Sequence, residues 1–185
     1  MNQINTAIIL CGGKGTRLGS AGKKNPKTLI KIQGKPILWY ILKFLKKNNF
    51  NHIILPIGFK GTQITKYLKN SNEFKNLNLE IKNTGQNTTI ANRIYKIKKL
   101  IRSENFLLLN GDAIIASDFK NLFQKHKKNK TGISFICSEA EANFGTVETN
   151  KGKIVNFSRG VKFTSINKDN KNFTGFVYSG LVFMN

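Results

Sequence analysis

The chain has 185 residues, of which 39% are hydrophobic, so it can build one domain with a core and is not a largely disordered protein. Lysine and arginine number 31 against 9 acidic residues, which gives a formal net charge of +22. No apolar run has the length of a membrane span, and the first residues lack the pattern of a secretory signal. Two cysteines cannot form a disulfide scaffold, so we expect a cytoplasmic protein.

The positive charge is mostly lysine, and the lysines are scattered along the chain. Proteins that bind specific nucleic acids usually add arginines and exposed aromatic residues, whereas this chain has only four arginines. We therefore expect no nucleic-acid partner and no membrane partner. A positive field still attracts small anions such as nucleotides and sugar phosphates.

The first two thirds of the chain alternate between strand and helix patterns. Thr6–Leu10 is a short apolar run that ends at glycines, which predicts a buried parallel strand. Similar runs predict strands at residues 52–55, 77–81, 106–109 and 132–137. Apolar residues at helical spacing predict helices from Pro36 onward and at residues 61–69, 88–102 and 118–127.

After residue 143 the pattern changes. Three further strands are predicted, at residues 145–149, 153–158 and 176–184, with no helix between them. The sequence therefore predicts one α/β domain over residues 1–185: a mostly parallel sheet with helices on both faces and a small antiparallel addition.

A glycine-rich segment, Gly12–Leu18, directly follows the first predicted strand. Successive N–H groups in such a loop can cradle an anion, and Arg17 would add a planar phosphate donor. The segment is neither a dinucleotide fingerprint, because Leu18 stands at its third glycine, nor a Walker A loop. It predicts a phosphate-binding loop; an ordinary glycine-rich turn is the alternative.

Two further motifs carry charge. Lys27 follows Pro26, and its ammonium group could add a positive charge beside the glycine-rich loop; an ordinary surface lysine is the simpler alternative. Asp112 closes Asn110-Gly111-Asp112 at the end of a predicted strand, where ligands of open α/β sheets bind. A carboxylate there can hold Mg²⁺ against a phosphate, and the chain has only three aspartates. The alternative is an aspartate in a turn.

The segment Leu10–Leu18 together with Pro26-Lys27 resembles the nucleotide signature of the sugar-1-phosphate nucleotidyltransferases. The likeness is greatest to the glucose-1-phosphate cytidylyltransferases. Residues 34–38 resemble the segment that opens their next helix, and Gly111-Asp112 resembles their metal-binding Gly-Asp pair. The resemblance covers the whole chain. It implies a Rossmann-like, GT-A-like nucleotidyltransferase fold and a homo-oligomer.

The resemblance also implies roles for individual residues. Arg17, Lys27 and Asp112 would be catalytic, with Asp112 as the Mg²⁺ ligand. The nucleotide would be bound by Leu10, Cys11, Gly12, Gly13, Lys14, Gly15, Thr16, Arg17, Lys27, Thr84, Gly85, Thr88, Arg93 and Gly111. The phosphate acceptor would be bound by Gly145, Arg159, Lys162, Ser179 and Gly180. The implied reaction joins CTP and glucose-1-phosphate into a nucleotide-sugar, with release of pyrophosphate, in polysaccharide precursor synthesis.

Three departures from the family pattern keep alternatives open. Ala91-Asn92 stands where the family has Gly-Gly, and residues 158–163 stand where it has Glu-Lys-Pro. Family members are longer and place a second metal-binding aspartate in the additional portion. The alternatives are another nucleotide (UTP, dTTP or GTP), a phosphate acceptor that is not a sugar, or a nucleotide-binding relative with impaired catalysis. We expect His52 and His126 to be structural and Cys11 to be a small buried residue.

Overall fold

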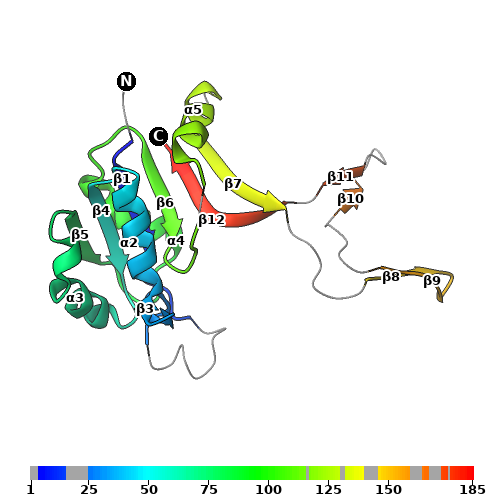
Figure 1. Ribbon diagram of the computed structural model, residues 1–185, viewed down its shortest axis with the longest axis horizontal. Helices are drawn as coiled ribbons and strands as arrows, with labels where there is room; N and C mark the ends of the chain where they lie inside the picture. The colour runs from blue at the N-terminus through cyan, green and yellow to red at the C-terminus, as the bar shows by residue number, and fades with distance from the viewer. Residues whose placement is uncertain are drawn as a thin grey trace. The chain divides into compact units, whose positions relative to one another are not determined.

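A six-stranded sheet in the order β5-β4-β1-β6-β12-β7 forms the centre of the fold (Figure 1). The computed structural model describes residues 4–15, 25–115, 117–129, 132–139, 146–158, 164–166, 172–174 and 176–185. The strands are β1 (Thr6–Leu10), β4 (His52–Ile57), β5 (Asn78–Asn83), β6 (Phe106–Asn110), β7 (Ile133–Glu139) and β12 (Phe176–Met184). Strands β5, β4, β1 and β6 are parallel, and β12 is antiparallel to β6. The predicted mostly parallel sheet is confirmed.

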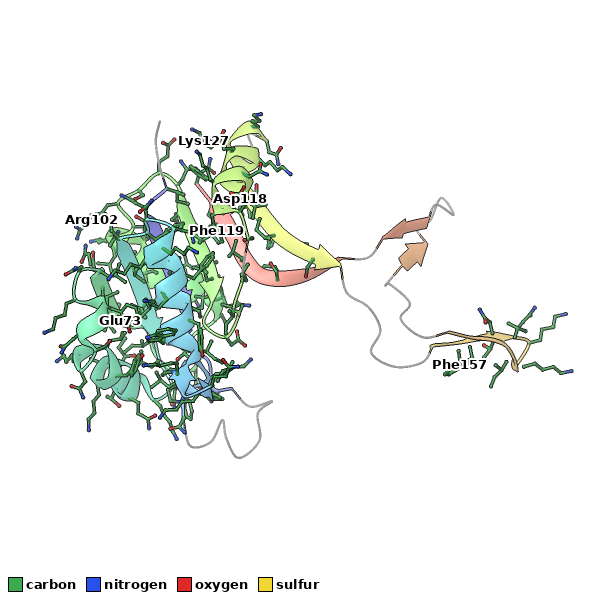
Figure 2. All side chains as sticks on the ribbon, in the orientation of Figure 1. Glu73, Arg102, Asp118, Phe119, Lys127 and Phe157 are labelled. Atoms are coloured by element: carbon green, nitrogen blue, oxygen red, sulfur yellow. The ribbon has the colours of Figure 1, made fainter. Side chains whose placement is uncertain are left out.

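Each predicted helix is present. The helices are α2 (Ile37–Lys47), α3 (Gly61–Lys69), α4 (Ile90–Ile97) and α5 (Phe119–Lys128), with short 3₁₀ turns η2 (Lys27–Leu29), η3 (Asn72–Phe74) and η4 (Lys98–Leu100). Helix α4 is shorter than the range predicted from its apolar residues. It begins after Thr89, whose hydroxyl accepts a hydrogen bond from the Asn92 N–H at 3.3 Å. At its other end the chain continues as the 3₁₀ turn η4. Helix α5 begins after Asp118, whose carboxylate accepts the Asn121 N–H at 3.1 Å (Figure 2).

One face of the sheet packs against α4. Neighbouring strands align Ile8, Ile54, Leu108 and Val182 on this face. All four are buried in one cluster with Ile97 of α4. Their alignment follows from the strand register, because side chains at paired positions of neighbouring strands point to the same face.

The opposite face packs against α5 and α2. Phe183, which follows Val182 on β12, points to this side because side chains alternate along a strand. Its ring centroid lies 5.9 Å from that of Phe119 and 5.8 Å from that of Phe123. Phe44 of α2 meets Phe119 edge-on at 4.8 Å. Helices therefore cover both faces of the sheet, as the sequence predicted.

The chain forms two compact units, Met1–Phe135 with Gly180–Asn185, and Ile136–Ser179. The first also contains the short strands β2 (Lys31–Ile32) and β3 (Lys35–Pro36). The second contains two antiparallel hairpins, made by β8 (Thr146–Asn150) with β9 (Lys153–Ser158) and by β10 (Thr164–Ile166) with β11 (Asn172–Thr174). The predicted antiparallel addition is present as β8–β9, but the third strand predicted for it, residues 176–184, is β12 of the central sheet, and the β10–β11 hairpin was not foreseen. One domain over the whole chain stays a prediction. Among the described helices, none is long and apolar enough to cross a membrane.

Candidate functional site

The predicted phosphate loop starts where β1 ends, at the carboxyl edge of the parallel strands. Leu10 pairs with Asn110 of β6, and Cys11 pairs with Ile57 of β4, so the loop leaves from between two neighbouring strands. Gly12 is buried, whereas Gly13 and Lys14 are exposed. Thr16 and Arg17 lie outside the described residues.

Lys27 and Asp112 meet beside this loop. Lys27 opens η2 and Asp112 follows β6, and the lysine ammonium donates a hydrogen bond to the aspartate carboxylate in a partly exposed ion pair. Two residues that are 85 positions apart in the sequence are thus brought together. They are two of the three residues to which the resemblance assigns catalysis.

Gly111 explains how Asp112 reaches the loop. The Gly111 N–H donates to the Leu10 carbonyl at 3.2 Å, and a Cβ on Gly111 would lie 2.6 Å from that oxygen and 2.5 Å from Thr28 Cγ2. A larger residue would push the Gly111-Asp112 turn away from β1. The absence of a side chain at Gly111 therefore sets the position of the carboxylate.

Thr28 is a candidate binding residue that sequence reasoning missed. Its side chain is only 4% exposed, and its hydroxyl has no hydrogen-bond partner within the described residues. A buried hydroxyl without a partner is uncommon and calls for an explanation, such as a ligand or a water molecule. The signal is tertiary, since Thr28 stands out only where it packs against Gly111.

A buried arginine joins the ends of three strands. Arg93 of α4 is 4% exposed, and its guanidinium donates to the carbonyl oxygens of Gly12 at 2.9 Å and Ile57 at 3.4 Å. It also donates to the Thr84 hydroxyl at 2.5 Å, which itself donates to the Ile57 carbonyl at 2.9 Å. The Thr88 hydroxyl donates to the Thr84 carbonyl at 2.6 Å. The structure therefore brings Thr84, Thr88 and Arg93 together with the glycine loop, and these groups bond to one another.

The Cys11 thiol lies within this packing, where burial disfavours its thiolate form. Burial raises its pKa to about 12, the Arg93 cation opposes this rise, and the Asp112 carboxylate adds to it. A thiol with such a pKa is protonated at neutral pH. The buried position predicted for Cys11 is confirmed.

The residues implied for the phosphate acceptor are less completely described. Gly145, Arg159 and Lys162 lie outside the described residues. The Ser179 hydroxyl donates to the Ile136 carbonyl at 2.6 Å. Gly180 is buried, and a Cβ on it would lie 2.9 Å from Cβ of Ala113, the residue after Asp112.

The oxygen ligands at the carboxyl edge of the sheet would suit Mg²⁺ together with phosphate oxygens of a nucleotide. No group of three metal-ligating side chains occurs among the described residues. Asp112 supplies one carboxylate beside the loop, and Mg²⁺ in proteins commonly takes one or two carboxylates, several waters and substrate phosphate oxygens. The site therefore suits an ion that arrives with a nucleotide better than a permanently bound one.

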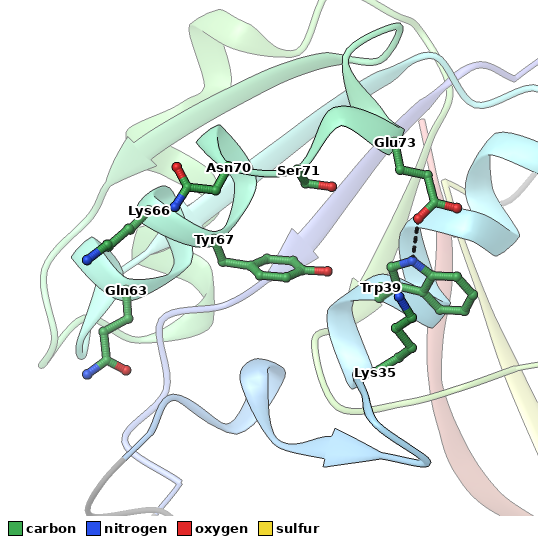
Figure 3. Close-up of a pocket in the computed structure, with 8 residues that line it drawn as sticks. All are labelled: Lys35, Trp39, Gln63, Lys66, Tyr67, Asn70, Ser71 and Glu73. Carbon is green, nitrogen blue, oxygen red and sulfur yellow. Dashed lines mark hydrogen bonds between the residues drawn. The ribbon is translucent and has the colours of Figure 1, made fainter.

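A hollow of about 520 Å³ is lined by residues of α2 and α3 (Figure 3). Trp39, Tyr67 and Lys66 line it, and the Trp39 indole donates to Glu73 at 2.6 Å. Hydrogen bonds from Lys43 and Trp39 lower the pKa of Glu73. The Glu73 carboxylate is therefore held by two side chains of α2.

Most of the chain is similar in sequence to curated proteins of named activity. The "Probable glucose-1-phosphate cytidylyltransferase" of Bacillus subtilis (strain 168) is 32% identical over 172 residues, which cover 82% of this chain and 67% of that protein. The "D-glycero-alpha-D-manno-heptose 1-phosphate guanylyltransferase" of Aneurinibacillus thermoaerophilus is 31% identical over 156 residues, 82% of this chain and 66% of that protein. The chain therefore spans about two thirds of the length of these relatives.

Solved structures share the fold. HddC from Yersinia pseudotuberculosis superposes with a TM-score of 0.71 at 22% identity, over 98% of this chain and 76% of that one. A UDP-glucose pyrophosphorylase complexed with UDP-glucose gives a TM-score of 0.70 at 15% identity, with the same coverage. The sequence model of the family described as "Nucleotidyl transferase" matches residues 6–158. Since this match runs from the first residue of β1 to the last residue of β9, the chain belongs to the nucleotidyl transferase family of enzymes.

Proposed function

We propose that this chain transfers a cytidylyl group from CTP to glucose-1-phosphate, giving a CDP-linked sugar and pyrophosphate. The observation that carries the proposal is the meeting of Lys27 and Asp112 beside the glycine loop, at the carboxyl edge of the sheet. The choice of CTP rests on relatives named glucose-1-phosphate cytidylyltransferase, which are 32% identical in Bacillus subtilis and 26% in Salmonella typhimurium. A homo-oligomeric state and a role in polysaccharide precursor synthesis belong to the same proposal and rest on resemblance. The proposed cytoplasmic location rests on the low cysteine count.

The reaction needs no covalent enzyme intermediate. A phosphate oxygen of the sugar phosphate attacks the α-phosphorus in line, one P–O bond forms, and the bond to the β-phosphate oxygen breaks. Peptide N–H groups of Gly13–Gly15 would hold the triphosphate, while the Lys27 ammonium donates to the phosphate oxygens. The protonated Cys11 thiol beside the loop agrees with direct displacement.

Asp112 would hold Mg²⁺ against the phosphates. When bound, the ion neutralises charge that gathers on the reacting phosphate oxygens. Lys27 and Asp112 supply opposite charges at one point, so they would fix both the phosphate and its counterion relative to the loop. Arg17 would add a third positive group, as the resemblance implies.

A second candidate is guanylyl transfer from GTP to a heptose 1-phosphate. Its support is the Aneurinibacillus thermoaerophilus guanylyltransferase, whose 31% identity nearly equals that of the Bacillus subtilis cytidylyltransferase. The two candidates share the phosphate chemistry and differ in the base and the sugar. They are therefore separated by substrates rather than by active-site variants.

The test is pyrophosphate release with Mg²⁺ across CTP, GTP, UTP and dTTP, each paired with glucose-1-phosphate and with D-glycero-α-D-manno-heptose 1-phosphate. We expect CTP with glucose-1-phosphate to be fastest; preference for GTP with the heptose would establish the second candidate instead. Lys27→Ala should abolish most turnover, and Lys31→Ala, which removes an exposed lysine of β2, is the matched control. Binding of CTP without turnover in any pair would refute the proposed activity and favour an impaired relative.

A further inference from the structure

We propose that a groove beside α2 and α3 is a second binding site, which takes a nucleotide and acts on Lys27. The groove consists of two hollows of about 520 Å³ and 670 Å³, which adjoin because Lys35 and Tyr67 line both. Each volume lies within the range of small-molecule sites, about 300–1,000 Å³. We call this pair of hollows the helix groove. Only its effect on Lys27 rests on the proposed function.

Three lysines make the helix groove positive. Lys31 and Lys35 are exposed on β2 and β3, and Lys66 is exposed on α3. Within the part of the chain that the structure describes, none of the three forms an ion pair. Glu73 also lines the groove, but its carboxylate is held by two side chains of α2. The free ammonium groups therefore favour an anionic ligand such as a phosphate.

Two aromatic rings add a second kind of surface. Tyr67 reaches from α3 toward Trp39 of α2, and Lys35 lies beside the indole (Figure 3). The Lys35 ammonium is 5.5 Å from the centroid of the Trp39 ring. Aromatic side chains stack on nucleobases, and ammonium groups bind phosphates. Rings and ammonium groups side by side therefore match a ligand that carries both a base and a phosphate.

The Tyr67 hydroxyl can add a hydrogen bond. Burial and the nearby Glu73 carboxylate raise the pKa of Tyr67, so the hydroxyl is protonated at neutral pH. A protonated phenol donates to a phosphate or a ribose oxygen.

The helix groove borders the turn that carries Lys27. Leu29 and Ile30 line the larger hollow, and η2 runs from Lys27 to Leu29. The Ile30 N–H donates to the Lys27 carbonyl at 3.2 Å, and the Ile37 N–H at the start of α2 donates to the Ile30 carbonyl at 2.9 Å. A ligand that displaces Leu29 or Ile30 therefore also displaces Lys27, whose ammonium meets Asp112. These bonds give a contiguous path between the two sites.

The experiment uses the fluorescence of Trp39, the single tryptophan of the chain. CDP, ribose 5-phosphate and cytidine are titrated into the full chain, with excitation at the red edge of the indole band, where cytosine does not absorb. We expect CDP to quench Trp39 and to saturate. Ribose 5-phosphate and cytidine should bind roughly tenfold more weakly, because one lacks the stacked base and the other the charged hydrogen bonds.

Lysine variants locate the bound CDP. The double variant Lys35→Gln/Lys66→Gln should weaken CDP roughly tenfold or more, since it removes two charged donors. Lys69→Gln is the matched control, because Lys69 is an exposed lysine of α3 that lines neither hollow. Lys27→Ala should leave the quenching in place, because it alters the proposed catalytic site and not the groove. Melting temperatures check that each variant is folded.

Three results would overturn the nucleotide site. Absence of quenching by CDP would show that no nucleotide binds beside Trp39. Quenching that is lost in Lys27→Ala and kept in the double variant would place CDP at the glycine loop. Quenching by ribose 5-phosphate as strong as that by CDP would show a phosphate site that does not select a base.

The effect on Lys27 has its own readout. In pyrophosphate-release assays with the fastest pair of nucleotide and sugar phosphate, CDP should change both kcat and KM in the wild type, and only KM in the double variant. An unchanged kcat in the wild type would contradict coupling between the groove and Lys27. If no pair is turned over, the proposed function fails, and the fluorescence titration still decides whether the groove binds a nucleotide.

Discussion

Two polar clusters occupy opposite ends of the same parallel strands. The amino-end cluster consists of Thr6, His52, Glu80, Arg102 and Ser103. The Thr6 hydroxyl lies 3.3 Å from His52 Nδ1 and 2.5 Å from the Ser103 hydroxyl, and His52 Nε2 lies 2.9 Å from the Glu80 carboxylate. In this cluster side chains bond to side chains.

The carboxyl-end cluster consists of Gly12, Gly58, Thr84, Thr88 and Arg93. There the side chains bond mainly to backbone carbonyls, and the exposed part of the glycine loop follows directly. The comparison teaches that polar content does not identify a binding site. What distinguishes the carboxyl end is that side chains bond to the backbone next to the glycine loop and a Lys–Asp pair, where we propose that the phosphates bind.

Removing the Asp112 carboxylate should have the largest effect on activity. We expect Asp112→Asn to keep the fold and to lower Mg²⁺-dependent turnover roughly a thousandfold, because a metal contributes several kcal/mol of charge stabilisation. The measurement is pyrophosphate release over a range of Mg²⁺ concentrations. Asp118→Asn is the matched control: Asp118 caps α5, and asparagine caps equally well. Normal turnover in Asp112→Asn would place the metal site elsewhere.

The close packing of the carboxyl-end cluster should protect a neighbouring thiol. Cys11 is buried and has a pKa of about 12 against an ordinary value of 9.0, whereas Cys137 is exposed. Three pH units correspond to about a thousandfold less thiolate, so native protein should take one iodoacetamide adduct, at Cys137. Mass spectrometry with and without denaturant checks this. Rapid native labelling of Cys11 would mean that the cluster opens readily.

Truncating the amino-end cluster should cost stability without changing substrate binding. His52 is 8% exposed, and His52→Ala removes the side chain that links the Thr6 hydroxyl to the Glu80 carboxylate, so each of these groups loses one partner. We expect a loss of about 1–3 kcal/mol in the free energy of unfolding, measured in urea, with an unchanged KM for CTP. Arg102→Ala, at the exposed rim of the cluster, should cost well under 1 kcal/mol. A raised KM in His52→Ala would show that the two ends are coupled.

The smallest effect concerns a histidine outside both clusters. His126 packs against the rings of Phe123 and Phe183, its Nδ1 lies 2.7 Å from the Ser134 hydroxyl, and burial lowers its pKa below the ordinary value of 6.5. Between the folded pKa and 6.5 the unfolded chain binds more protons, so the free energy of unfolding should rise with pH there and level off above 6.5.

The slope from one such proton cannot exceed about 1.4 kcal/mol per pH unit. Urea unfolding between pH 5 and 7 should be less pH-dependent in His126→Gln than in the wild type. Identical pH profiles would contradict the burial of a neutral His126.

Local patterns predicted most of the elements. Strands β9 and β12 have the predicted bounds, and α3 matches its predicted range, because alternation and helical spacing are short-range properties of the sequence. The short strands β2, β3, β10 and β11 were missed, since two or three residues are too few to show a period. The start of α4 depended on the Thr89 cap, and its end on the tightening into η4, rather than on the apolar pattern.

The motifs of the site are predictable from short stretches of sequence: the glycine loop, Lys27 and Asp112 each follow a strand or a turn that local residues specify. Which of these groups meet depends on how the strands pack in the folded chain. Lys27 and Asp112 meet because the strand order places β6 beside β1. Arg93 can be buried against the backbone because Gly12 and Gly58 have no side chains in the space that its guanidinium occupies. Strand register and packing set such contacts between residues far apart in the chain, and no short stretch of sequence carries that information.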